Sequence, residues 1–142
     1  MKNAFFIKKL SIPTISLIVI FLTIQMPFVS TSTGTLTITV TNSTSDAVAL
    51  WNYNANSRSV GENSLYGQST IIEANTSKTC QVPDDASYSF ILIPTKFNIK
   101  PNYSPRNPNW IDSSKLQESK QLFFYQDNSS KFFRTQAAAP SN

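Results

Sequence analysis

The chain contains no histidine and one cysteine, so few of its side chains could carry bond-making chemistry. Catalytic triads and dyads that use histidine are excluded, as are zinc sites built from histidine or from cysteine clusters. Serine is abundant, but the sequence has no G-x-S-x-G nucleophile elbow and no glycine-rich phosphate loop. The sequence therefore predicts that the protein is not an enzyme and has no catalytic residue, no metal ligand and no cofactor.

Carboxylates are the remaining candidates for acid–base chemistry, and they are sparse. A glycosidase needs two of them held roughly 5–10 Å apart in a cleft, and no spacing in this sequence specifies such a pair. Asp84 and Asp85 follow a proline in an expected turn. Asp112 precedes an expected short helix, and Asp127 opens an expected hairpin turn. Turn and capping roles account for all four side chains, so a carboxylate-only enzyme and a calcium site are the alternatives favoured least.

Aromatic side chains are the best candidates for binding. Trp51 and Tyr53 share one face of an expected strand, and Tyr103 and Trp110 lie in a loop rich in proline and asparagine. Aromatic rings on rigid loops stack on sugars or insert into membrane interfaces. The four residues form the predicted ligand-binding set. The alternative for each tryptophan is ordinary packing, with Trp51 in the core and Trp110 pinning the long loop, because aromatic residues dominate cores.

Two further patterns have simple structural interpretations. Cys80 shares strand parity with Val82, which predicts a buried thiol, and pairing with a second chain is the alternative. Threonine recurs at every second position from Thr35 to Thr41, which predicts the solvent face of a strand. An ice-binding ladder is the alternative there, but it needs several parallel rungs and the sequence offers one strand.

The first thirty residues differ from the rest. Three lysines within the first nine residues precede an apolar stretch over residues 15–24, and small residues follow at 30–32. This order is typical of a secretory signal peptide, which we place over residues 1–32 as a helix, with an uncleaved membrane anchor as the alternative. The protein is then expected to be secreted, periplasmic or attached to the cell envelope.

The apparent basicity of the chain belongs to this segment. Removing residues 1–32 from the 142 leaves 110 residues, with nine basic and eight acidic side chains. A nearly neutral domain without a cationic cluster is not expected to bind nucleic acid, or anionic lipid by electrostatics. Four N-x-S/T sequons are about as many as this composition gives by chance, and they lie at Asn42, Asn75, Asn102 and Asn128.

Short strands must position the candidate residues. Strict alternation predicts a strand over residues 35–41, and a second strand over 48–53 is expected to pair with it as a hairpin. Further strands are expected at 69–74, 78–82, 88–93, 122–126 and 131–135, the last two as a second hairpin. Residues 83–86 are expected to form a turn. A short helix over 113–120, capped by Asp112, interrupts the second of two long loops, 54–69 and 97–121.

About seven short strands separated by turns predict an all-β fold, an antiparallel β-sandwich that is Ig-like or jelly-roll-like. One domain is expected over residues 33–136, followed by a disordered tail over 137–142. The expected function is that of a binding or adhesion module whose long loops contact a glycan, a protein or a surface. The alternative is a membrane-active, cytolysin-like protein, because the last hairpin is rich in phenylalanine; an envelope subunit also fits but is predicted by nothing specific.

Overall fold

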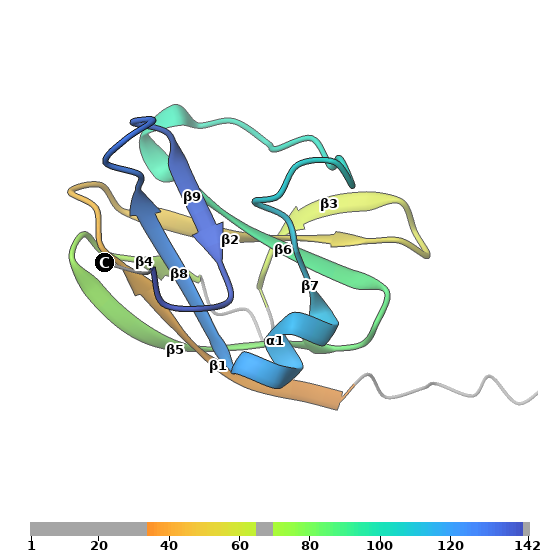
Figure 1. Ribbon diagram of the computed structural model, residues 1–142. Helices are drawn as coiled ribbons and strands as arrows, with labels where there is room; N and C mark the ends of the chain where they lie inside the picture. The colour runs from red at the N-terminus through yellow and green to blue at the C-terminus, as the bar shows by residue number, and fades with distance from the viewer. Residues whose placement is uncertain (1–33, 65–69, 141–142) are drawn as a thin grey trace, which may run out of the picture. The chain divides into compact units, whose positions relative to one another are not determined.

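The computed structural model describes residues 34–64 and 70–140 of the 142-residue chain (Figure 1). The predicted signal peptide over residues 1–32 lies outside these described residues. The described chain forms nine strands in two sheets and one short α-helix, which confirms the predicted all-β class. Within it, no helix has the length and apolar character that crossing a membrane requires.

The two sheets combine strands from distant parts of the sequence. The four-stranded sheet has the order β5-β1-β8-β9, and its strands are β1 (Gly34–Asn42), β5 (Thr76–Asp84), β8 (Gln121–Gln126) and β9 (Phe133–Gln136). The five-stranded sheet has the order β3-β2-β6-β7, and its strands are β2 (Val48–Asn54), β3 (Ser59–Glu62), β4 (Ile71–Ile72, also paired with β2), β6 (Tyr88–Pro94) and β7 (Ile111–Asp112). The remaining elements are a 3-10 helix, η2 (Thr95–Phe97), and an α-helix, α1 (Ser113–Ser119).

The hydrophobic core collects side chains from both sheets. Phe90 of β6 and Phe124 of β8 are its largest fully buried members. Each such side chain stabilises the fold by roughly 1.5–3 kcal/mol relative to an exposed one. Most of the other core members are aliphatic, namely Ile38, Val40, Val48, Leu50, Ile72, Val82, Leu92, Ile111, Leu116 and Leu122.

Strand β1 shows why the alternation was informative. Ile38 is buried, whereas Thr37 and Thr39 are exposed, so the threonine face is a solvent face as predicted. Cys80, directly opposite Ile38 in the register of β1 with β5, is also buried, which confirms the predicted orientation of its thiol. Burial raises the pKa of this thiol, an effect that the nearby Lys78 opposes.

The predicted hairpin between the first two strands is wrong. β1 pairs with β5 and β8, whereas β2 pairs with β3, β4 and β6, so the chain crosses from one sheet to the other over residues 43–47. Alternation tells which face of a strand is buried but not which strand it pairs with, because both arrangements bury the same side chains. The pairing of β1 with β8 is also parallel, which departs from the all-antiparallel expectation.

Two short strands account for the difference between the nine observed and the seven predicted strands. β3 lies inside the expected loop 54–69, and β7 lies inside the expected loop 97–121. The expected turn at 83–86 starts later, because β5 continues to Asp84 and pairs with β1 to its end. The second hairpin, formed by β8 and β9, is confirmed.

Helix α1 is confirmed. Of its predicted cap, the position of Asp112 is confirmed but the capping hydrogen bond is not. Asp112 occupies the N-cap position without making a side-chain capping hydrogen bond. Its Oδ1 instead accepts a hydrogen bond of 3.0 Å from Oγ of Ser89 on β6. The carboxylate therefore joins β7 to β6 rather than capping the helix.

Side-chain hydrogen bonds join the two sheets at two places. Asn63, which follows β3, is buried and donates from Nδ2 to the carbonyl of Gln81 on β5 at 2.9 Å. On the opposite side, Thr135 of β9 accepts a hydrogen bond from the backbone N–H of Leu92, at 3.3 Å, through its hydroxyl. The N–H of Thr135 then donates to Oδ1 of Asn109 at 3.1 Å, which ties the long loop to β9.

Candidate binding groove

The outer face of the five-stranded sheet carries most of the predicted binding residues. In β2, Val48 and Leu50 are fully buried in the core, whereas Trp51 and Tyr53 point to the other face and are partly exposed. The proline- and asparagine-rich loop over residues 98–110 covers part of that face (Figure 1). This matches the expectation that Trp51 and Tyr53 point outward or toward a covering loop.

Three of the four predicted binding residues form one aromatic cluster. Tyr53 and Tyr103 are stacked, with ring centroids 3.6 Å apart and an angle of 6° between the planes. Trp110 meets them edge-on, with its centroid 6.5 Å from that of Tyr53 and 5.3 Å from that of Tyr103. Such pairs contribute about 0.5–1.5 kcal/mol each beyond the burial of their area. The cluster therefore fastens the long loop to the sheet.

Trp110 completes this anchor. It is buried, and its Nε1 donates a hydrogen bond of 3.2 Å to the carbonyl of Asn102 within the same loop. An indole N–H that is removed from water needs such a partner. The packing interpretation of Trp110, as the residue that pins the loop, is therefore the one that the geometry supports.

Trp51 stands apart from the cluster. Among the described aromatic residues it makes no ring contact, and it lines a groove of about 430 Å³ on the same sheet face. We call this feature the Trp51 groove. Its other lining residues are Ala49, Glu62, Ile71, Ile93, Pro94, Thr95, Asn98, Ile99 and Lys100.

The Trp51 groove combines an aromatic ring with apolar and polar partners. Ile99 is 57% exposed and Ile71 is 38% exposed, so apolar side chains are accessible at the groove. Glu62 offers an acceptor and Lys100 a donor, and neither makes an ion pair within the described chain. A ligand with one apolar face and several hydroxyl groups matches this arrangement.

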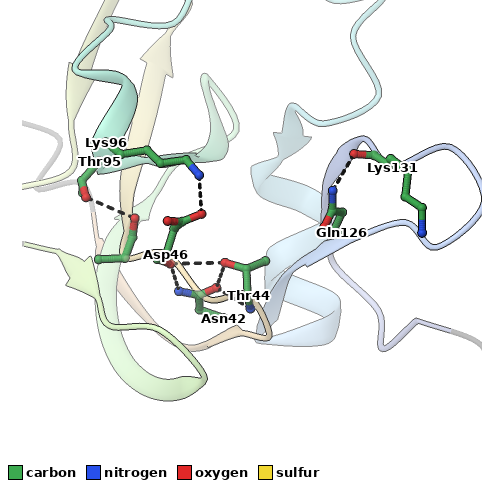
Figure 2. A network of polar contacts seen from close by, with 8 residues as sticks. Asn42, Thr44, Asp46, Thr95, Lys96, Gln126 and Lys131 are labelled. Carbon is green, nitrogen blue, oxygen red and sulfur yellow. Dashed lines mark hydrogen bonds and ion pairs between the residues drawn. The ribbon is translucent and has the colours of Figure 1, made fainter.

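A polar network fixes the start of the loop that walls the groove (Figure 2). The N–H and hydroxyl of Thr95 both donate to the carbonyl of Ala47, at 2.9 and 3.2 Å. Lys96 forms an ion pair of 2.6 Å with Asp46. Asn98 ends η2 in the left-handed conformation, which asparagine tolerates better than most residues. The position of Ile99 and Lys100 thus depends on the crossing between β1 and β2.

That crossing is itself held by a buried asparagine. Nδ2 of Asn42 donates to the carbonyls of Asp46, Glu73 and Ile72, at 2.8, 3.0 and 3.3 Å. Its Oδ1 accepts hydrogen bonds from the N–H and the hydroxyl of Thr44, at 3.0 and 2.7 Å (Figure 2). Nδ2 is also the atom to which a glycan would be attached, so the sequon at Asn42 is blocked in the folded chain. Asn75, Asn102 and Asn128 are exposed.

Another hollow was not predicted from the sequence. It is a polar cleft of about 960 Å³, bordered by residues 43–46, by Lys96 and by the β8–β9 turn. Asp46 is engaged by Lys96, and Asp127 accepts hydrogen bonds from Ser129 and Ser130. These bonds hold the pKa of Asp127 well below its usual range. Asp127 is therefore ionised at neutral pH and cannot serve there as a general acid.

No local sequence pattern predicts this cleft, because its two main walls lie about eighty residues apart in the chain and consist of residue types that are common in turns. Within residues 34–64 and 70–140, no group of three or more histidine, cysteine, aspartate or glutamate side chains could hold a metal ion. No protein-family model, no curated protein and no solved structure matches this chain.

Proposed function

We propose that the protein is a non-enzymatic binding module whose Trp51 groove holds a sugar ring of a glycan. The observation that carries the proposal is the placement of the Trp51 ring in a groove that also presents a carboxylate, an ammonium group and an amide, from Glu62, Lys100 and Asn98. The apolar C–H face of a sugar ring would lie against the indole. Its hydroxyl groups would then reach the three polar side chains.

The aromatic cluster supports this function indirectly. Tyr53, Tyr103 and Trp110 contact one another, so we assign them the role of holding the loop rather than of stacking on the ligand. Trp51 is then the ligand-contacting member of the predicted set. The proposed setting is a β-sandwich, Ig-like or jelly-roll-like, that is secreted or attached to the cell envelope after the segment 1–32 has directed export.

Affinity for a single sugar ring should be modest. At about 0.3 kcal/mol per non-hydrogen atom, a ring of roughly twelve such atoms gains about 4 kcal/mol, which corresponds to a dissociation constant near 1 mM. An oligosaccharide that continues along the groove would bind more tightly. A glycan array is therefore the appropriate first screen, because its multivalent display detects weak single-site binding.

The test is binding of an array hit to the wild-type protein and to three variants, measured by calorimetry. We expect Trp51→Ala to reduce affinity at least tenfold and Trp51→Phe to reduce it less, because phenylalanine retains an aromatic face. Phe132→Ala, which removes an exposed aromatic ring outside the groove, is the matched control and should leave affinity unchanged. Full affinity in Trp51→Ala would remove the groove as the binding site.

A membrane-active protein is the second candidate, and one observation favours it. Phe97 and Phe132 are 46% and 67% exposed, which is unusual for side chains that are this apolar. Aromatic side chains of this kind insert at membrane interfaces. Release of dye from loaded vesicles tests this candidate, and absence of release with neutral and anionic lipid mixtures would eliminate it.

A further inference from the structure

An apolar cavity of about 220 Å³ adjoins the Trp51 groove. The two hollows share three lining residues, Ile93, Pro94 and Ile99, so they lie on either side of the same short stretch of wall. The remaining lining of the cavity is mostly apolar and consists of Ile91, Leu92, Phe97, Asn107, Asn109, Phe124, Phe133 and Thr135. A polar-rimmed groove therefore continues beside an apolar space.

The cavity has a structural origin in the pairing of β6. β7 pairs with β6 at Ser89 and Phe90 and ends there, so no strand of the described chain lies beside the remainder of this β6 edge. The long loop and β9 cover that edge instead. A loop packs against a sheet edge less closely than a strand does, and a space remains between them.

Three backbone N–H groups at this edge already have partners. The N–H of Leu92 donates to the hydroxyl of Thr135, and the N–H of Thr135 donates to Oδ1 of Asn109. The N–H of Asn109 in turn donates to Oδ1 of Asn107 at 3.0 Å. A ligand group in the cavity is therefore not required to satisfy these groups, and an apolar occupant suits the site.

The cavity opens at an apolar rim. Phe97 and Ile99, which both line it, are also strongly exposed to solvent. The ring of Phe97 meets that of Phe133 edge-on, with centroids 6.4 Å apart, so this exposed side chain is fixed against the cavity wall. The ammonium group of Lys96 lies 5.5 Å from the centroid of the Phe97 ring, so the apolar part of the rim for an entering alkyl chain is Ile99.

We propose that the ligand is an amphiphile, a glycolipid whose sugar lies in the Trp51 groove and whose alkyl chain passes Ile99 into the apolar cavity. The sugar half of this inference rests on the proposed function, whereas the chain half rests on the cavity and its continuity with the groove. The accessible indole and the exposed Phe97 ring, which favoured separate functions, are then parts of one site, whereas the exposed Phe132 lies outside it.

The test uses β-glucosides with methyl, butyl and hexyl chains, at concentrations below micelle formation, and measures affinity by calorimetry. Each methylene that enters the cavity should raise affinity about fourfold, so a chain that buries four of them should gain roughly two-hundredfold over the methyl glucoside. Methyl-group NMR locates the chain, and we expect the largest shifts at Ile91, Leu92 and Ile93.

Two variants separate the cavity from the groove. Ile91 lines the cavity and not the groove, so Ile91→Phe should fill the cavity and abolish the gain from chain length. Because Ile91 lies opposite Trp51 in the register of β2 with β6, unchanged binding of methyl glucoside is the check that the indole keeps its place. Phe97→Ala, at the exposed rim, should reduce the gain without threatening the fold. Phe132→Ala is the matched control and should keep the full gain.

The outcomes distinguish the two proposals. One outcome is that methyl glucoside binds in a way that depends on Trp51, but longer chains add no affinity or shift methyl signals away from the cavity. This outcome would overturn the proposed amphiphile and leave the sugar site. A gain from chain length that is unaffected by Trp51→Ala would support the cavity and overturn the sugar site. Failure of every glucoside to bind, with plain phosphatidylcholine vesicles binding tightly, would overturn the glycolipid in favour of a membrane contact.

Discussion

Replacement of Asn42 by aspartate should destabilise the fold in a strongly pH-dependent way. The side chain is 1% exposed, and its amide donates to the backbone carbonyl of Asp46 in the crossing and to those of Ile72 and Glu73 at the end of β4. A carboxyl group has nearly the same shape, so Asn42→Asp leaves packing unchanged and alters only the hydrogen bonds and the charge. The two hydrogen bonds accepted from Thr44 are retained.

The magnitude follows from the partners that are lost. The carbonyl of Asp46 also accepts a hydrogen bond from the Thr44 hydroxyl, and a protonated carboxyl can serve one of the other two carbonyls. One buried carbonyl is then left without a donor, so the deficit is about 1–3 kcal/mol when the group is neutral. An ionised carboxylate would point at carbonyl oxygens in a buried site, which raises its pKa. A rise of about two units adds nearly 3 kcal/mol when the group must be charged.

The sign of the pH dependence is therefore fixed. The introduced carboxyl titrates near 3.9 in the unfolded chain and at higher pH in the folded one, so the folded state holds its proton longer. The variant loses stability as pH rises from about 4 towards 7, whereas Asn42→Ala should show a deficit that does not change over this range.

Urea unfolding at pH 4 and pH 7, followed by the fluorescence of the buried Trp110, measures the loss of unfolding free energy and its change with pH. Asn128→Asp, which makes the same change at an exposed sequon, is the control and should cost less than about 0.5 kcal/mol. Equal deficits for Asn42→Asp at the two pH values, or a deficit no larger than that of the control, would refute the view that the amide organises this crossing.

Three other expectations concern single residues. Cys80 should react with a disulfide reagent at pH 8 far more slowly in the folded protein than in urea, because burial shields the thiol and raises its pKa. The stability difference between wild type and Asp127→Ala should be constant near neutrality and shrink as pH falls below about 4, because the folded-state pKa of Asp127 is lowered. Tyr103→Ala should speed hydrogen exchange over residues 98–110 at a cost of about 1 kcal/mol, and unchanged exchange would contradict its anchoring role.

The sequence was informative wherever a feature depended on local periodicity. Alternation in β1 and the position of Leu50 beside Trp51 predicted which side chains are buried, because strand geometry alone decides this. Strand pairing was not predictable in the same way. The crossing after Asn42 and the parallel contact of β1 with β8 depend on which distant segment lies alongside, and local residue types do not encode that choice.

The candidate site shows the same division. The four aromatic residues were predicted as one binding set, yet the fold uses three of them as a loop anchor and leaves Trp51 at a groove. No residue type distinguishes these roles in advance. What distinguishes them is the path of the long loop, which brings Tyr103 onto Tyr53 but leaves Trp51 to line a groove together with residues 98–100.

The position of the groove between two anchors bears directly on how it would bind. The loop is held at its start by Asp46 with Lys96, and at its end by the cluster around Trp110. The wall residues, 98–100, lie between these two points and are ordered before any ligand arrives. Because ordering a loop on binding costs affinity, anchors that are already formed leave more of the contact energy for the ligand. Loosening either anchor should therefore weaken binding even though neither one would touch the proposed ligand. Where the loss of one anchor already mobilises the other, removing both should weaken binding by less than their separate effects combined.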